Sequence, residues 1–282
     1  MLYSSDNDAY DTSPGRKDFL SGLLLDCRFY FYFRICFNFC RIGRCAAHGQ
    51  FNRENQARYC GRNVDILEQC GARLHLRGLN HLTEIPGPFV LAGNHMSSIE
   101  TIVLNAFLSP RLDFTFVIKQ GLFSVPFFRR AMRAIDAIGV GQRNPREDFV
   151  TVMKEGAERL NAGRSVLIFP EAARYREFQP ERFNTIAVKL ARAVGVPIIP
   201  FALKTDFITP GKILYECGPL HLENQIHIEF GSPLTVSGNG RTEQSAIIRF
   251  IQERTRSWAA ERAVPGRNPG SKPVASSTTN CC

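Results

Sequence analysis

Residues 91–104, LAGNHMSSIETIVL, place His95 between two apolar runs, with Glu100 five residues later. In a regular helix, side chains five residues apart point about 140° away from each other and do not meet. His95 and Glu100 can pair only if a helix begins between them, with Ser97 or Ser98 as its N-cap. The carboxylate would then hold one ring nitrogen and leave the other as an acceptor, which is the arrangement of a general base. The alternative is a histidine that serves only the core or a loop.

Two further polar stretches follow apolar runs of strand length. Residues 139–148, GVGQRNPRED, and residues 169–178, FPEAARYREF, are loop-like, and each carries arginines. In open α/β sheets, ligands bind beyond the carboxyl ends of the strands. We therefore expect these two stretches and the His95 loop to face one cleft.

The elements that would position these loops alternate along the chain. Short apolar runs are followed by patterns of helical period, which favours an α/β fold with a largely parallel sheet flanked by helices. We expect an N-terminal membrane-associated helical segment to precede this fold. The expected strands lie within residues 88–93, 113–118, 135–140, 165–170, 196–203 and 225–231. The expected helices start near residue 98 and cover residues 122–135, 145–160, 185–195 and 241–262.

Composition divides the chain into four parts. Residues 1–18 are polar and without periodicity, and residues 263–282 are rich in Pro, Gly, Ser and Thr, so both ends are expected to be disordered. Residues 19–62 form a basic, aromatic segment that we expect to be helical and membrane-associated. Residues 63–262 form the main domain, whose length is sufficient for its own core.

The net charge of +9 predicts an anionic partner. Residues 27–62 hold seven arginines, no lysine and a single acid, Glu54, and they overlap the aromatic run RFYFYFRICFNFCRIGR. Nucleic-acid binders also combine arginine with aromatic rings. Here apolar residues stand at nearly every position, which favours an anionic membrane surface over nucleic acid. A buried helix that happens to be basic remains an alternative.

Residues 19–44 are long enough to span a bilayer, but Asp26, Arg28 and Arg34 would cost about 2.5 to 3.5 kcal/mol each at its centre. We therefore expect this segment to lie on the membrane. Its polar side would hold Asp26, Arg34, Asn38, Arg41 and Arg44, and its apolar side Leu24, Leu25, Phe29, Phe31, Ile35 and Phe39.

The nine cysteines form no paired CxxC units, so neither a disulfide framework nor a redox motif is expected. Cys36, Cys40, Cys45 and His48 are close in sequence but alternate with Phe, Ile and Arg. We expect no metal at these residues.

Four motifs of the chain resemble those of the glycerolphosphate and lysophospholipid acyltransferase family. Asn94-His95 with Glu100 is similar to the family's first motif, a His followed after four residues by an acid. Residues 169–174, FPEAAR, are similar to its usual FPEGTR, residues 141–143 to its variable second motif, and residues 196–200, VPIIP, to its fourth. Order and spacing agree from about residue 74 to residue 234. Two departures are Glu100 in place of Asp, and Ala172-Ala173 in place of Gly-Thr, which would narrow the site if the glycine serves close approach of substrate.

The resemblance implies a 1-acylglycerol-3-phosphate acyltransferase-like enzyme, in which His95 is the general base and Glu100 orients it. Arg143, Glu171 and Arg174 would bind the acceptor, with the two arginines on its phosphate. Lys119 and Arg146 are expected to be ordinary surface charges.

The implied donor is acyl-CoA or an acyl carrier protein, used as co-substrate with no cofactor and no metal, because a thioester is already activated. The acceptor would be a lysophospholipid at the cytoplasmic side of a membrane. The alternatives are another acceptor, such as glycerol 3-phosphate or a lyso-aminolipid, and a membrane-binding relative without activity.

Overall fold

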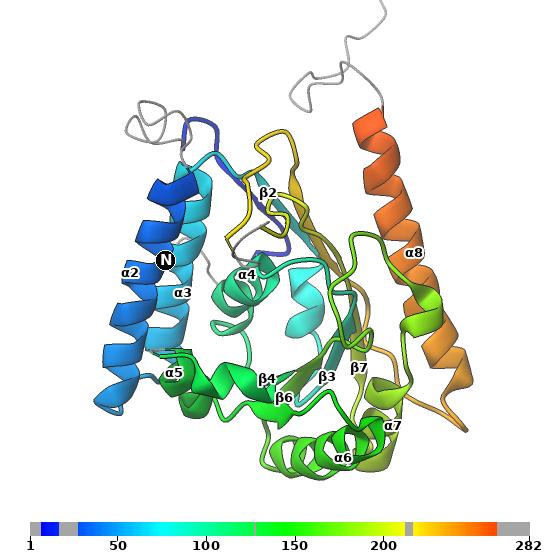
Figure 1. Ribbon diagram of the computed structural model, residues 1–282. Helices are drawn as coiled ribbons and strands as arrows, with labels where there is room; N and C mark the ends of the chain where they lie inside the picture. Colours follow the sequence, from blue (N-terminus) through cyan, green and yellow to red (C-terminus); the bar gives the residue numbers. More distant parts are fainter. Residues whose placement is uncertain (1–6, 17–27, 127, 212–216, 264–282) are drawn as a thin grey trace, which may run out of the picture.

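The computed structural model describes residues 7–16, 28–126, 128–211 and 217–263. An eight-stranded sheet runs through the molecule, with helices on both of its faces (Figure 1). Within the described ranges, no helix combines the length and the apolar character that a membrane crossing requires.

The strand order of the sheet is β1-β2-β8-β7-β3-β6-β4-β5. Pairing is parallel at every step except β1 with β2 and β7 with β8. The largely parallel α/β fold that the sequence predicts is thus confirmed. The strands are β1 (Tyr10–Asp11), β2 (Leu74–Arg77), β3 (Val90–Gly93), β4 (Phe114–Lys119), β5 (Ile138–Val140), β6 (Ser165–Ile168), β7 (Ile198–Lys204) and β8 (Ile226–Phe230).

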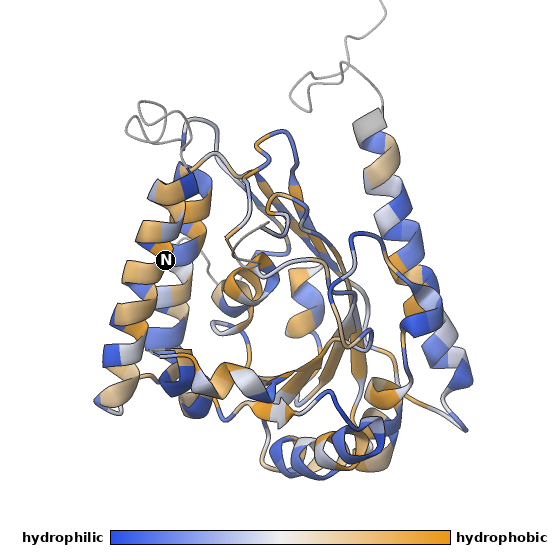
Figure 2. Cartoon of the chain, in the orientation of Figure 1, coloured by the Kyte–Doolittle hydropathy of each residue, from blue (hydrophilic) through white to orange (hydrophobic). Residues whose placement is uncertain are grey.

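Central strands are buried on both faces, which is why they read as continuous apolar runs. Along β3, Leu91 packs into the core on one side of the sheet, while Val90 and Ala92 pack into the core on the other. Figure 2 shows the apolar strands between the helices; α8 is largely polar, whereas α2 carries many apolar residues.

Seven α-helices cover the sheet in the described part of the chain. They are α2 (Arg28–Ala47), α3 (Arg53–Gln69), α4 (Ile99–Leu108), α5 (Phe128–Ala134), α6 (Pro145–Asn161), α7 (Ile186–Val194) and α8 (Arg241–Ala263). Short 3₁₀ turns occupy Leu79–Leu82, Gln120–Ser124 and Pro180–Arg182. Core residues of α3 and α4 join one side of the sheet, and those of α6, α7 and α8 join the other.

The start of α6 shows why sequence signals locate some helices well. The Asn144 side chain accepts from the N–H groups of Arg146 and Glu147, and Pro145 stands at the first helical position. By contrast, the helix expected over residues 122–135 is a 3₁₀ turn followed by α5, because Pro126 lacks the N–H that a continuous helix needs.

The expectation of disorder for residues 1–18 is wrong for residues 7–16. Tyr10–Asp11 pairs with β2, and the hydroxyls of Tyr10 and Thr12 donate to the buried Glu68 at 2.7 and 2.6 Å. Arg16 forms an ion pair with the same carboxylate. A buried carboxylate needs such partners, and the polar N-terminus supplies them. The rest of residues 1–18, and residues 264–282 of the expected tail, lie outside the described residues.

The expected boundary between residues 62 and 63 falls inside α3, so α2 and α3 do not form a separate unit. α2 packs on α3 and α5, and Phe31 and Ile35 join the core that also holds Leu67 of α3. The expected polar side of this segment is also wrong in part. Asn38 is buried and donates to Asn63 Oδ1 at 2.7 Å, and Arg34 donates to Gln69 Oε1 at 2.6 Å. The part of residues 19–44 before Arg28 lies outside the described residues.

Candidate active site

The predicted functional loops gather at one edge of the sheet because each follows a parallel strand. The His95 loop follows β3, residues 141–144 follow β5, and residues 169–179 follow β6. β3 pairs in parallel with β6, β6 with β4, and β4 with β5, so their carboxyl ends lie on the same edge. The three loops therefore gather at one edge of the sheet, as the sequence predicts.

Asn94 fixes the start of the His95 loop. It is fully buried, its Nδ2 donates to Leu203 O at 2.9 Å, and its Oδ1 accepts from Leu203 N at 2.8 Å. The amide side chain thereby adds two more hydrogen bonds to β7 just beyond the end of β3. This anchor sets the position of the next residue, His95.

His95 and Glu100 form the predicted pair. α4 begins at Ile99 with Ser98 as its N-cap, so His95 precedes the helix and Glu100 lies in its first turn. His95 Nδ1 hydrogen-bonds Glu100 Oε2. A carboxylate on Nδ1 fixes the tautomer with the proton on that nitrogen and leaves Nε2 as an acceptor.

Glu100 is held from several directions. Its Oε1 accepts from the backbone N–H groups of Met96 and Ser97, both at 2.7 Å, and from the hydroxyl of Thr205 at 2.6 Å. Its side chain has no exposed surface. This many donors hold the buried carboxylate in one orientation toward the His95 ring.

Phe169 fixes the plane of the His95 ring. The two rings stack with centroids 4.1 Å apart and an angle of 16°, and Phe169 meets Phe201 edge to face at 5.8 Å. The His95 side chain keeps 19% of its surface exposed. In the described part of the chain, no protein group hydrogen-bonds Nε2. Phe169 belongs to one of the sequence motifs, but the motif does not show that its ring contacts His95. Nothing in the sequence indicates that Thr205 donates to Glu100.

Glu171 links the His95 loop to the loop after β6. One carboxylate oxygen accepts from His95 N–H at 2.9 Å and the other from Gln179 N–H at 3.0 Å. Burial raises the pKa of Glu171 to about 7, although both backbone bonds and the nearby His95 act to lower it. Tyr175 N–H donates to His95 O at 2.9 Å, so this loop holds the His95 backbone on both of its polar groups.

The predicted arginines differ in exposure. Arg174 is half-buried and lines a small hollow, and Arg143 is exposed in the turn after β5. The hollow is formed by Met96, Ser97, Ser98, Arg174, Ile208, Thr209 and Pro210. Arg174 therefore lies beside the His95 loop. Lys119 and Arg146 are exposed, as expected of surface charges.

Ala172 has left-handed backbone with φ 56°, the conformation that glycine adopts most easily. It stands where the family pattern has glycine, so a glycine there has a conformational role. Both Ala172 and Ala173 are exposed.

Comparisons with known proteins identify sequences similar to this chain. Residues 73–204 match the family model described as Acyltransferase. This stretch of the chain is therefore similar to the acyltransferase family. A 1-acyl-sn-glycerol-3-phosphate acyltransferase of Pseudomonas aeruginosa is 29% identical over 191 residues, which cover 68% of this chain and 69% of that protein. The chloroplastic 1-acyl-sn-glycerol-3-phosphate acyltransferase LPAT1 of Arabidopsis thaliana is 30% identical over 46% of this chain and 36% of its own length.

The same fold occurs in the crystal structure of the 1-acyl-sn-glycerophosphate (LPA) acyltransferase, PlsC, from Thermotoga maritima. The TM-score is 0.63 at 17% identity, with 88% of this chain and 99% of that chain covered. The stretch that matches the family model, residues 73–204, contains His95, Glu100, Arg143, Glu171 and Arg174.

Proposed function

We propose that the protein transfers a fatty acyl group from an acyl thioester to the free hydroxyl of a lysophospholipid, with 1-acylglycerol 3-phosphate as the acceptor and phosphatidate as the product. The observation that carries this proposal is the oriented His95–Glu100 pair, at the same sheet edge as the loops of Arg143 and Arg174. The acyltransferase relatives support lysophosphatidate acylation in phospholipid biosynthesis.

His95 acts as the general base in this reaction. Its Nε2 takes the acceptor's hydroxyl proton while the oxygen attacks the thioester carbonyl carbon. Nδ1–H stays on Glu100, whose negative charge stabilises the imidazolium. When the tetrahedral intermediate collapses, the C–S bond breaks and the thiolate receives the proton from Nε2. The hydroxyl thus becomes an ester and the donor leaves as a free thiol, without a covalent acyl-enzyme.

Arg174 and Arg143 bind the phosphate of the acceptor. A planar guanidinium gives two parallel hydrogen bonds to phosphate oxygens. Arg174 lines the hollow formed by residues of the His95 loop and residues 208–210, so a phosphate held there places the glycerol hydroxyls toward His95. Glu171, with each carboxylate oxygen bonded to a backbone N–H, serves this site by holding the two loops together.

The protein binds an anionic membrane surface from the cytoplasmic side, as a peripheral protein. Phe29, Phe33 and Phe37 stand one turn apart on α2 and are 70%, 71% and 57% exposed. Exposed aromatic rings along one helix are typical of an interfacial anchor. This row of phenylalanines, and not the arc of Arg34 and Asn38, is the side that the helix offers to lipid.

Helix α2 is also linked to the hollow beside the His95 loop. Tyr32 of α2 donates to Gly218 O at 2.9 Å, and a Cβ on Gly218 would lie 1.6 Å from the oxygen of Thr209. Thr209 lines the hollow that holds Arg174. Gly218 thus lies between Tyr32 of α2 and Thr209 at the hollow, which places the hollow near α2.

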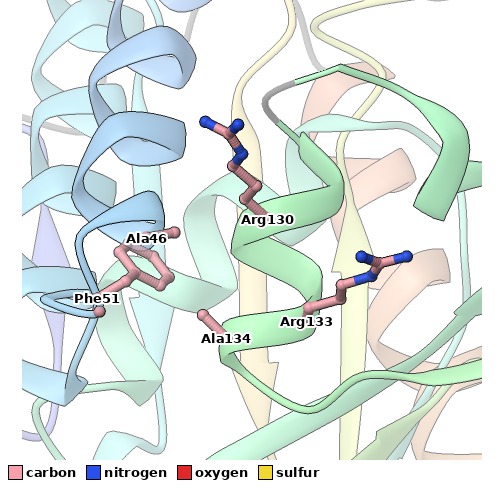
Figure 3. Close-up of a pocket in the computed structure, with 6 residues that line it drawn as sticks. Ala46, Phe51, Arg130, Arg133 and Ala134 are labelled. Atoms are coloured by element: carbon pink, nitrogen blue, oxygen red, sulfur yellow. The ribbon is translucent and has the colours of Figure 1, made fainter.

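α5 supplies cations beside α2. Arg130 and Arg133 project from it at a cavity of about 460 Å³, which Ala46, Gly49, Phe51 and Ala134 also line (Figure 3). Both arginines are exposed, and neither has a carboxylate partner within the described ranges. Exposed arginines near an aromatic face are suited to anionic headgroups.

The test is acyl transfer by the purified protein, with labelled acyl-CoA and labelled acyl carrier protein as donors and a panel of acceptors. We expect lysophosphatidate to be the best acceptor and a monoacylglycerol without phosphate to be poor. Preference for glycerol 3-phosphate or a lyso-aminolipid would change the acceptor but keep the chemistry. No transfer to any acceptor, by protein that binds vesicles, would indicate a membrane-binding relative without activity.

A further inference from the structure

The turn after β5 is built in an unusual way. Gln142 has left-handed backbone with φ 60°, a conformation that side-chain-bearing residues rarely adopt. Asp148, in the first turn of α6, accepts from Gly141 N at 2.8 Å with one carboxylate oxygen and from Gln142 N at 2.9 Å with the other. The carboxylate thus compensates for the unfavourable backbone, and the Asn144 cap fixes the rest of the turn on α6.

This turn is joined to the loop after β6 by one side chain. Gln142 Nε2 donates to Ala172 O at 2.8 Å. Ala172 is the other left-handed residue of the two loops, at φ 56°. The preceding residue, Glu171, accepts from His95 N–H, so the connection runs from the turn of Arg143 to the backbone of His95.

The contact also sets the distance between two cations. Arg143 follows Gln142 directly, and Arg174 comes two residues after Ala172. Adjacent Cα atoms are about 3.8 Å apart, so the Cα atoms of both arginines lie within about 10 Å of the Gln142–Ala172 hydrogen bond. Two guanidinium groups can reach one phosphate only if the loops keep this separation.

We propose that Gln142, held by Asp148, is a positioning residue that fastens the Arg143 turn to the Arg174 loop and so lets both arginines bind one acceptor phosphate. This inference rests on the proposed function, because it assigns the two arginines to the acceptor. It predicts that Gln142 affects recognition of the phosphate and leaves the chemistry at His95 alone.

The experiment compares Gln142→Ala and Gln142→Glu with wild type. A net neutral hydrogen bond is equivalent to about 3- to 10-fold in affinity, so we expect the acceptor KM to rise by that factor in Gln142→Ala and by more in Gln142→Glu, whose carboxylate also repels the phosphate. Gln142→Glu keeps the shape but offers no donor to Ala172 O. The kcat and the donor KM should stay within about twofold. Gln252→Ala on α8, far along the chain from both loops, is the control and should change neither constant.

Asp148 provides a graded comparison. Asp148→Asn keeps one oxygen acceptor for the two N–H groups and Asp148→Ala keeps none, so the acceptor KM should rise in the order wild type, Asn, Ala. Melting temperatures show whether either variant has lost its fold. Asp148→Asn, the milder change, remains informative if Asp148→Ala is unstable.

The decisive readout is dependence on the phosphate. The affinity of each variant for lysophosphatidate and for monoacylglycerol is measured directly, without turnover. We expect Gln142→Ala to weaken only lysophosphatidate binding, and to add little when Arg143→Ala is already present. Equal weakening for both lipids, or an unchanged lysophosphatidate affinity, would overturn the inference. A wild-type protein that binds lysophosphatidate but does not acylate it would refute the proposed function and leave this binding comparison valid.

Discussion

Arginines and aromatic rings occur together in two regions of the molecule, around His95 and along α2 and α3, and the two regions differ in what organises them. Around His95, the partners of each group come from a few residues nearby or from the end of an adjacent strand. Glu100 lies in the first turn of the helix that follows His95, and Glu171 follows β6. Along α2, Asn38 and Arg34 find their partners on α3, 25 and 35 residues further along the chain. The first arrangement is set by strand ends that meet at one edge of the sheet, and the second by how two helices pack.

The first and largest expected effect tests the region around His95. His95→Ala removes the base whose Nε2 takes the acceptor's proton. General-base catalysis contributes about 10² to 10⁴ in rate, so kcat should fall by that factor. The melting temperature should fall as well, because the ring stacks on Phe169 and is a partner of the buried Glu100, so kcat is compared at a temperature where both proteins are folded. Activity within threefold of wild type would falsify the assignment of the base.

Arg174→Ala tests whether the hollow beside His95 recognises phosphate. A lost charge-assisted pair costs on the order of 2 to 3 kcal/mol, which is about 30- to 150-fold. We expect this factor in the KM of lysophosphatidate, and little change in the KM of the acyl donor. Equal increases in the two KM values would mean that Arg174 supports the shape of the site and does not recognise the phosphate.

Glu171, in the region around His95, makes the folding stability depend on pH. Its pKa is raised from 4.5 to about 7, so the folded protein binds more protons than the unfolded chain between these values. Folding stability should therefore fall as the pH rises through this window, by at most about 1.4 kcal/mol per unit.

Thermal unfolding of wild type and Glu171→Gln across that window is the measurement. The carboxamide does not titrate, so the wild-type melting temperature should decline relative to the variant as the pH increases. Parallel curves would show that the buried carboxyl is ionised throughout, with its two N–H donors outweighing burial.

The sequence predicted the site better than its surroundings, for a physical reason. A strand end, an N-cap and an acid two residues into a helix are short-range features, so the His95–Glu100 pair could be predicted from residues 91–104. The faces of α2 could not, because an arc of polar residues is the same pattern whether it meets water or a polar seam such as Asn38 with Asn63. Tyr10 and Thr12 were missed because their partner, Glu68, is more than 50 residues away.

The smallest expected effect sharpens the comparison at α2, where two changes on opposite sides of one helix should separate membrane binding from folding. Phe33 is 71% exposed, and Asn38 is buried against α3. Complete burial of a phenylalanine is worth about 1.5 to 3 kcal/mol, and shallow insertion realises part of this, so Phe33→Ser should weaken binding to anionic vesicles by about 3- to 10-fold. It should leave the melting temperature unchanged, because the ring contributes little to the core. Asn38→Ala should do the reverse, since it leaves a buried Asn63 without its partner at a cost of about 1 to 3 kcal/mol. Vesicle flotation and thermal unfolding of both variants measure the two properties independently. If Asn38→Ala were the variant that lost vesicle binding at full stability, the polar arc would be the side facing the lipid, and α2 would have to leave α3 when the protein binds the membrane.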